Sequence, residues 1–328
     1  MATDASLRSP QFPGTLPPSP FPTDDPILSR IGNTPMIAYP GVEDGRLLCK
    51  LESENPTRSM KDRIAMGILT EVLQKGDYHT VIEASSGNTA GAVALVANRL
   101  DVTCKLTCPE GTSPDKVGYM KAFGAEVHKC PNVDSDHPDH YRAEARRLAD
   151  EEGAFLVDQY HNQSNPDVHY RWTGPELWAQ AGAEITHLVS AMGTGGLLSG
   201  SARYVKEQAK KEGRNVAVVG VDAEHSNIST AFYGEDPVPY DTGVEGLGKG
   251  GNLPTMWFDY IDEVRSVADD TAYQQARTSA QAHGMPIGPS AGAALSVGLE
   301  IHAAHPDARV ATIICDGGEQ YFDTLFDV

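Results

Sequence analysis

The sequence predicts an α/β fold with two open, mostly parallel, twisted sheets that are flanked by helices. Short apolar segments typical of buried strands alternate with longer segments whose apolar residues recur at helical spacing. Strands separated by helices of this length pair in parallel through right-handed crossovers. The spacing of the alternating strands and helices changes after Trp172, and no internal repeat is visible. Two α/β units that face one another are therefore the expected architecture.

The first 26 residues are expected to lie outside this architecture. They contain seven prolines together with Ser, Thr and Asp, and their apolar residues show no period. This composition is typical of a disordered extension, or of an arm that becomes ordered only on a neighbour. Ordered sequence is expected from about Ile27, with a first strand at 46–51.

The first unit alternates between strands and helices along its length. Strands are predicted at 81–84, 102–106, 125–128 and 155–157, and helices at 64–73, 89–100, 113–123 and 141–152. The helix at 89–100 is rich in Ala and Val, and Ser-Pro stands at the start of the helix at 113–123.

The second unit repeats this alternation at a different spacing. Strands are predicted at 186–190, 216–221 and 310–315, and helices at 176–181, 199–212, 271–283 and 292–304. The first of these strands runs straight into glycines, and the last is apolar in the manner of a buried strand.

Composition excludes several classes of function. The chain has 328 residues and a formal net charge of −19, which argues against nucleic acid as a partner. No run is apolar enough to span a bilayer, and the start of the chain lacks the basic-then-apolar pattern of a signal peptide. The five cysteines are odd in number and lack the spacing of a metal site. We therefore expect free thiols, no bound metal and a cytoplasmic protein.

One segment, Asn55-Pro56-Thr57-Arg58-Ser59-Met60-Lys61-Asp62-Arg63, places a lysine at the start of a helix. Asn-Pro favours a turn, Ser59 can cap the helix, and Asp62 falls in its first turn. The positive end of the helix dipole disfavours the charge of Lys61 there. A lysine held partly neutral suits Schiff-base chemistry with an aldehyde cofactor. For the lysine taken alone, an ordinary solvated side chain is the alternative.

Three polar loops stand between a predicted strand and a helix, or at a helix start. Gly193-Thr194-Gly195-Gly196 offers backbone N–H groups for a phosphate, although taken alone it is more often simply a tight turn between a strand and a helix. Ser85-Ser86-Gly87-Asn88-Thr89 presents hydroxyls and an amide that suit a carboxylate, or simply cap the helix. Ser290 starts a further helix, where capping is the ordinary role.

Together and in this order, these segments resemble the cysteine synthase and cystathionine β-synthase family, which are fold type II enzymes that use pyridoxal phosphate. Asp158-Gln159-Tyr160, Asn165-Pro166 and Thr173-Gly174-Pro175-Glu176 also fit the family. The resemblance runs from Gly32-Asn33-Thr34-Pro35 to Gly317-Gly318. It implies a cofactor in the cleft between a larger domain, 27–48 and 161–328, which holds the cofactor phosphate, and a smaller domain, 49–160, which holds the substrate carboxylate.

The resemblance also assigns roles to matching residues. Lys61 would form the Schiff base and move the Cα proton, Asn88 would contact the ring hydroxyl oxygen, and Ser290 the pyridine nitrogen. The remaining expected residues hold the phosphate (Gly193, Thr194, Gly195, Gly196), hold the substrate carboxylate (Ser85, Ser86, Gly87, Thr89, Gln159) or belong to a mobile loop near the substrate (Glu245, Gly246). Glu245 is expected either to contact a substrate amine or to be solvated.

The implied function is β-replacement on an O-activated serine by a sulfur nucleophile, which forms cysteine. The alternatives are cystathionine β-synthase, a diamino-acid-forming relative that uses an amine nucleophile, a dehydratase, and a silent member that only binds a partner. Two departures from the family pattern, Leu197 in place of Thr and Gln320 in place of Arg, leave the substrate more open than the chemistry. A homodimer acting on small molecules is expected, without nucleic acid or membrane partners.

Overall fold

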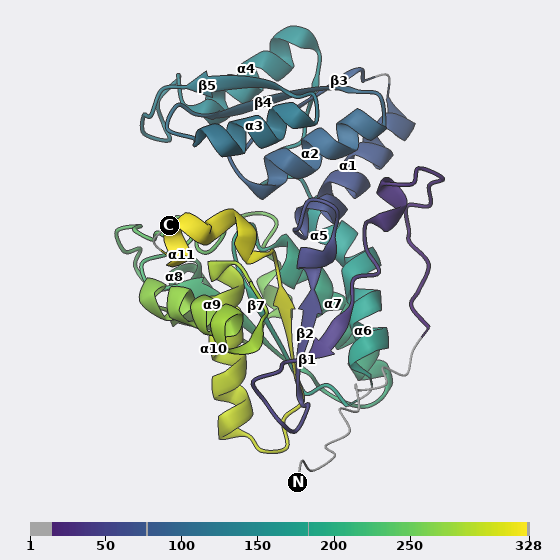
Figure 1. The fold of residues 1–328 in the computed structure, drawn as a ribbon, viewed down its shortest axis with the longest axis vertical. Helices are drawn as coiled ribbons and strands as arrows, with labels where there is room; N and C mark the ends of the chain where they lie inside the picture. The colour runs from purple at the N-terminus through teal and green to yellow at the C-terminus, as the bar shows by residue number, and fades with distance from the viewer. Residues whose placement is uncertain (1–14, 77, 183, 327–328) are drawn as a thin grey trace.

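The computed structural model describes residues 15–76, 78–182 and 184–326, which form two units, each built around one sheet (Figure 1). One sheet has six strands and the other has four. All neighbouring strands pair in parallel except the first two of the six-stranded sheet. The predicted fold class is therefore confirmed.

The smaller unit contains strands β3 (Thr80–Ala84), β4 (Thr103–Pro109), β5 (Glu126–Cys130) and β6 (Phe155–Leu156), and helices α1 (Lys61–Lys75), α2 (Asn88–Arg99), α3 (Pro114–Ala122) and α4 (Tyr141–Glu152). Its strand order is β5-β4-β3-β6. In Figure 1, α4 covers the face of this sheet that points away from the larger unit. Alternation along β3 produces the two layers: Val81 packs in the cluster that contains α1 and α2, and Ile82 packs against α4.

The larger unit contains strands β1 (Met36–Ala38), β2 (Leu47–Leu51), β7 (His187–Ala191), β8 (Ala217–Ala223), β9 (Glu263–Val267) and β10 (Val310–Ile314). Its helices are α5 (Ser164–Val168), α6 (Gly174–Ala181), α7 (Gly196–Lys211), α8 (Ile228–Tyr233), α9 (Asp269–His283), α10 (Pro289–Ala304) and α11 (Phe322–Phe326), with a π-helical turn at His169–Thr173. The strand order is β1-β2-β10-β7-β8-β9. Every residue of the central strand β10 is buried, as its apolar sequence predicts.

The boundary between the units differs from the predicted one. We expected the smaller domain to begin at residue 49, but β2 pairs with β10 from Leu47 to Leu51 and so belongs wholly to the six-stranded sheet. The smaller unit is entered only afterwards, through the segment that leads into α1. Three short elements, β1, β9 and α8, were not predicted, and β1 and β9 are the two edge strands of the six-stranded sheet.

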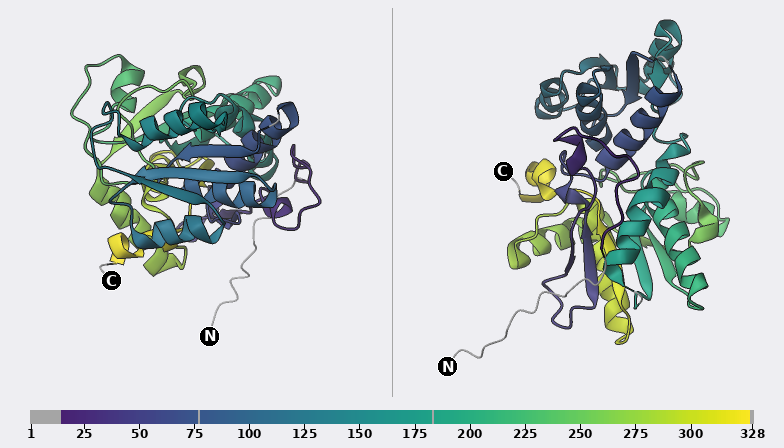
Figure 2. Two further views of the ribbon diagram at one scale, coloured as in Figure 1. Left: turned by 90° about the horizontal axis from the view of Figure 1, so that it is seen from above. Right: turned by 90° about the vertical axis from the view of Figure 1, so that its right-hand side faces the viewer.

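The expected disordered extension through residue 26 is wrong for residues 15–26, whereas residues 1–14 lie outside the described part of the chain. The Phe21 ring is buried, with its centroid 5.5 Å from that of Trp172. Asp25 accepts hydrogen bonds from the Arg99 guanidinium of α2, one of them 2.6 Å long. This segment follows the edge of both units (Figure 2). One buried aromatic ring and one ion pair hold it in place without any apolar period.

All five cysteines are free, as predicted, and all are buried. Among the described residues, no helix has the length and apolar character needed to cross a membrane.

Candidate active site

A cavity of about 400 Å³, the central cavity, lies between the two units. It collects the C-terminal ends of β3, β7 and β10, because the strands of each parallel sheet end on the same edge. Its wall contains most of the predicted site residues: Lys61, Ser85, Ser86, Gly87, Asn88, Thr89, Gln159, Gly193, Thr194, Glu245, Gly246 and Ser290. Gly195 and Gly196 do not line the cavity, but they connect its wall to the start of α7.

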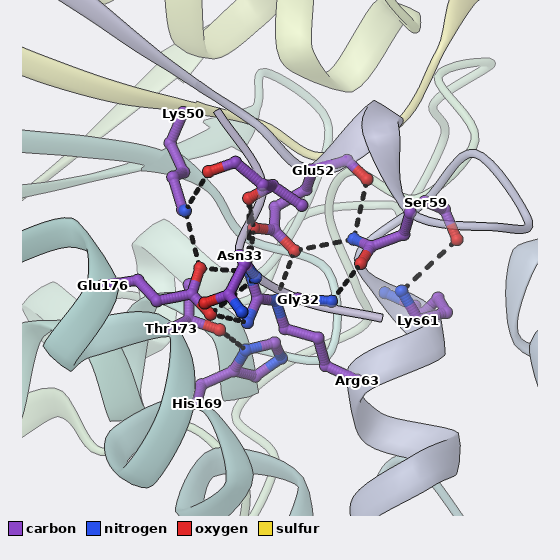
Figure 3. Close-up of polar contacts among 12 residues, drawn as sticks. Gly32, Asn33, Lys50, Glu52, Ser59, Lys61, Arg63, His169, Thr173 and Glu176 are labelled. Carbon is purple, nitrogen blue, oxygen red and sulfur yellow. Dashed lines mark hydrogen bonds and ion pairs between the residues drawn. The ribbon is translucent and has the colours of Figure 1, made fainter. Parts of the chain in front are cut away.

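Lys61 is the first residue of α1, as predicted, and lines the central cavity. Its backbone N–H donates to Ser59 Oγ at 3.3 Å, which fixes the start of the helix (Figure 3). Burial is the largest cause that lowers the pKa of Lys61, and the nearby positive charge of Lys249 lowers it further. Asp316 opposes this shift. Removal from water, rather than the helix dipole expected from the sequence, is the main reason that the amine favours its neutral form.

Four fully buried charged side chains, Lys50, Glu52, Arg63 and Glu176, form a network beneath the start of α1 (Figure 3). Arg63 donates to Glu52 Oε2 at 2.7 Å and to Glu176 Oε2 at 2.8 Å, and Lys50 Nζ lies 2.7 Å from Glu176 Oε2. Burial would raise the pKa of Glu52, but Arg63 and Lys50 hold it at about 2. This buried ion network ties the first turn of α1 to β2 and α6, and thereby positions Lys61.

The loop between β7 and α7 has no room for a side chain at its glycines. A Cβ at Gly193 would overlap the carbonyl oxygen of Gly246, and one at Gly196 would overlap the side chain of Asn165. Gly195 has φ +82°, a conformation that L-residues with side chains rarely adopt. The side chain of Asn165 donates to Thr194 Oγ1 at 3.1 Å and so holds the loop. These features leave backbone N–H groups at the N-terminus of a 16-residue helix, which suits an anion.

Asn88 begins α2 and connects the two units. Its Nδ2 donates to Asp316 Oδ2 at 2.8 Å, while its Oδ1 is buried and has no hydrogen-bond partner. Thr89 Oγ1 donates to Gln159 Oε1 at 2.7 Å, and Gln159 Nε2 donates to Glu83 Oε1 at 3.0 Å. The last two residues of the predicted polar loop, Asn88 and Thr89, are therefore held by hydrogen bonds to Asp316 and Gln159.

Asp316, which follows β10, is a cavity residue for which the sequence analysis assigned no role. Besides Asn88, the Tyr321 hydroxyl donates to its Oδ2 at 2.6 Å. Burial raises the pKa of Asp316 to about 6. Its position directly after a buried strand was the available signal, because strand ends of parallel sheets carry site residues.

Glu245 lies at the mouth of the central cavity. Lys116 Nζ of α3 lies 2.6 Å from Glu245 Oε1, and both side chains are partly exposed. This ion pair connects the loop of the larger unit to the smaller unit across the mouth.

Glu83 gives a testable dependence of stability on pH. It is fully buried, burial raises its pKa to about 8, and its Oε2 has no hydrogen-bond partner. Between the ordinary pKa of a glutamate and about 8, the unfolded chain loses this proton first, so the contribution of Glu83 to stability falls as pH rises. Glu83→Gln removes that fall, because glutamine does not titrate. The free energy of unfolding of the variant minus that of wild type, measured with urea, is therefore expected to rise by on the order of 3 kcal/mol from pH 5 to pH 8.

Glu110→Gln, on an exposed side chain, is the matched control for the substitution itself. A stability difference between Glu83→Gln and wild type that stays constant across this pH range would contradict the assignment.

Comparison with known proteins places the chain among related sequences and structures. A family model described as "Pyridoxal-phosphate dependent enzyme" matches residues 27–316. Cysteine synthase B of Escherichia coli (strain K12) is 34% identical over 303 residues, which cover 90% of this chain and 93% of that protein.

Solved structures agree with the sequence comparisons. The crystal structure of O-ureido-L-serine synthase has a TM-score of 0.84 at 26% identity and covers 93% of this chain and 96% of that chain. O-acetyl serine sulfhydrylase isoform 3 from Entamoeba histolytica has a TM-score of 0.82 at 26% identity, with coverage of 96% and 95%. The similarity therefore extends over both units and the cavity between them.

Proposed function

The chain belongs to the family of pyridoxal-phosphate-dependent enzymes, and we propose that it replaces the β-substituent of an O-activated serine with sulfur, forming cysteine. The family predicted from the sequence motifs is thereby confirmed, and pyridoxal 5′-phosphate is the cofactor. The observation that carries the proposal is the convergence of Lys61, Asn88, Ser290 and Thr194 on one cavity. The relationship to cysteine synthases supports sulfur as the nucleophile.

The residues of the central cavity fit the cofactor. The glycine loop at the start of α7 would hold its phosphate, because no Cβ blocks the backbone N–H groups. Asn88, whose Oδ1 lacks a partner and whose amide Asp316 orients, would contact the ring hydroxyl. Ser290 at the start of α10 would meet the ring nitrogen. The larger unit would thus hold the phosphate, and the smaller unit the substrate carboxylate.

When bound, pyridoxal phosphate withdraws electrons from the substrate Cα and so allows its proton to leave. Lys61, with its lowered pKa, would accept that proton and later return it. Ser290 is a neutral hydroxyl and does not keep the ring nitrogen protonated, which favours rapid β-elimination over long-lived negative charge at Cα.

The substrate carboxylate would bind to the loop of Ser85, Ser86, Gly87 and Thr89, together with Gln159. The Thr89–Gln159–Glu83 chain of hydrogen bonds supports this proposal, because it holds both the loop and the amide in fixed positions. Glu245 forms an ion pair with Lys116 at the mouth of the cavity. The substrate would have to enter past this ion pair, or the pair would have to separate, before the reaction starts.

Product analysis with the holoenzyme tests the proposed function. Cysteine is expected from sulfide with an O-activated serine, tested as both O-acetylserine and O-phosphoserine. Formation of cystathionine from serine and homocysteine, with no cysteine from either ester, would replace the proposal by the cystathionine β-synthase alternative. Pyruvate released without any thiol would indicate a dehydratase.

A nitrogen-containing nucleophile is a second candidate. The structure of O-ureido-L-serine synthase, with a TM-score of 0.84, supports it, since that product is named as a serine derivative without sulfur. Incubating an activated serine with an amine, or with hydroxyurea, whose hydroxyl oxygen would bond to Cβ in an O-ureido product, in place of sulfide distinguishes the candidates by the mass of the product.

Gly195→Ala tests the phosphate cradle. A side chain at φ +82° would be strained and would overlap Met256, so the loop would shift. We expect the affinity for pyridoxal phosphate to fall at least about tenfold, since left-handed backbone alone costs about 1–2 kcal/mol. Titration of the apo-protein with cofactor, followed by absorbance, measures this. Gly213→Ala is the control, because Gly213 has φ +69° and open space, and equal affinities in the two variants would contradict the assignment.

We also infer a homodimer in a reducing compartment such as the cytoplasm. The five free, buried cysteines support the compartment, and the family resemblance supports the dimer. Light scattering is expected to give twice the chain mass of 35.1 kDa.

A further inference from the structure

Two cations, Arg142 and Lys249, line the central cavity without a carboxylate partner in the described residues. Arg142 lies in the first turn of α4, and its buried Nε has no hydrogen-bond partner. Lys249 lies three residues after Gly246 of the cavity loop. The chain carries 45 acidic residues against 26 basic ones, so adjacent unpaired cations are not a consequence of its composition.

Both cations are held beside Tyr160. The Arg142 guanidinium carbon lies 4.7 Å, and Lys249 Nζ 5.6 Å, from the centroid of the Tyr160 ring. The backbone of Lys249 is fixed as well: its N–H donates to Ser226 Oγ at 2.8 Å, and its carbonyl accepts from the Asn227 N–H at 2.8 Å. The two charges therefore occupy defined positions, as a binding site requires.

These two cations lie close to residues that are proposed to bind the substrate and to transfer its proton. Tyr160 directly follows Gln159, the proposed carboxylate ligand, and Lys249 is close enough for its charge to lower the pKa of Lys61. The same three residues, Arg142, Tyr160 and Lys249, also line a second cavity of about 430 Å³. These three residues therefore lie on the wall that the two cavities share.

Nearby carboxylates are already engaged elsewhere. Asp158 lies 2.9 Å from His161 Nδ1, and Asp222 accepts from the backbone N–H groups of Ala223 and Ser229. Glu83 accepts from Gln159. Burial lowers the pKa of Lys249 to about 8, and the charge of Arg142 contributes to that shift. Two like charges held together in this way are stabilised by a bound anion, which neutralises both.

We propose that Arg142 and Lys249 form a subsite for a dianionic phosphate group on the β-carbon of the substrate, so that the activated serine is O-phosphoserine. This inference rests on the proposed β-replacement. An acetyl ester is neutral and would gain nothing from the two cations, whereas a phosphate forms charge-assisted hydrogen bonds with both. The subsite also stabilises the negative charge that develops on the leaving oxygen.

Lys61 takes the Cα proton, the Cβ–O bond breaks, and its electron pair leaves with the phosphate oxygen. Sulfur of hydrogen sulfide then bonds to Cβ, and Lys61 returns the proton to Cα. O-phosphoserine and hydrogen sulfide thus give cysteine and hydrogen phosphate, the second proton of hydrogen sulfide ending on the phosphate. No oxidant or reductant is required.

Steady-state kinetics of the holoenzyme with sulfide test the subsite. Wild type is expected to have a higher kcat/KM for O-phosphoserine than for O-acetylserine. Lys249→Met and Arg142→Met should each lower kcat/KM for O-phosphoserine about 10- to 100-fold more than they lower kcat/KM for O-acetylserine. Lys249→Arg should retain the preference, because it keeps the charge. Lys210→Met, on an exposed lysine at the end of α7, is the matched control.

Inorganic phosphate provides a second readout. It should inhibit the holoenzyme competitively with O-phosphoserine, more strongly than chloride at equal ionic strength, and Lys249→Met should weaken this inhibition. Equal losses for both esters, or a wild-type preference for O-acetylserine, would overturn the subsite while leaving the proposed function intact. Variants that instead raise KM only for an anionic nucleophile would also overturn it. Absence of cysteine from either ester would refute the proposed function itself.

Discussion

Replacing Lys61 with alanine is expected to abolish the covalent link to pyridoxal phosphate and to lower turnover by at least about 10³-fold. The reason is geometric and electrostatic: the amine lies at the start of α1, faces the central cavity, and has a pKa lowered by burial. The measurements are the visible absorption of the purified variant and its rate of cysteine formation. Borohydride treatment followed by peptide mass mapping identifies the modified lysine.

Lys75→Ala is the matched control, because Lys75 is an exposed lysine at the other end of the same helix. Urea unfolding of both variants separates a loss of chemistry from a loss of fold. A Lys61→Ala protein that keeps both its linked cofactor and its turnover, for instance through Lys249, would contradict the assignment. A wild-type protein that binds the cofactor but turns over none of the tested substrates would favour the silent, partner-binding alternative.

Replacing Arg63 with alanine is expected to destabilise the protein by about 3–5 kcal/mol. The substitution leaves the buried carboxylates of Glu52 and Glu176 with Lys50 as their remaining cation in the buried ion network. Removing one partner of a buried pair costs more than the pair contributes, because an uncompensated charge stays in the interior. Urea unfolding at neutral pH measures the change.

Arg147→Ala is the control, because Arg147 pairs with Glu144 and Glu151 on the exposed face of α4. Exposed pairs of this kind contribute roughly 0–1 kcal/mol. Combining Arg63→Ala with Glu52→Gln should restore part of the lost free energy of unfolding, because the double variant buries one carboxylate fewer than Arg63→Ala alone. Equal destabilisation by Arg63→Ala and Arg147→Ala would contradict the role of the buried ion network in fixing α1.

Local patterns account for what could be predicted from the sequence. The strands β3, β7 and β10 are apolar runs bounded by polar or glycine-rich loops, so both their type and the loops at their ends were recognisable. The resemblance to the family then predicted that those loops form one site. The structure places nearly all of the predicted residues on the wall of one cavity.

Contacts between distant residues could not be predicted in this way. Arg63 and Glu176 are 113 positions apart, and neither shows locally that it is buried. Asn88 and Asp316 meet across 228 positions. Tyr160 brings Arg142 and Lys249 together only in the folded chain. The segment around Phe21 was missed for a related reason, because a single ring that packs on Trp172 leaves no periodic signal.

The visible absorption spectrum of the purified protein tests the central claim most directly. We predict a yellow protein with a band from lysine-linked pyridoxal phosphate. The band should shift when O-phosphoserine or O-acetylserine is added and should return when sulfide follows. A colourless protein that takes up no pyridoxal phosphate, or a yellow one whose spectrum responds to neither ester, would contradict the account.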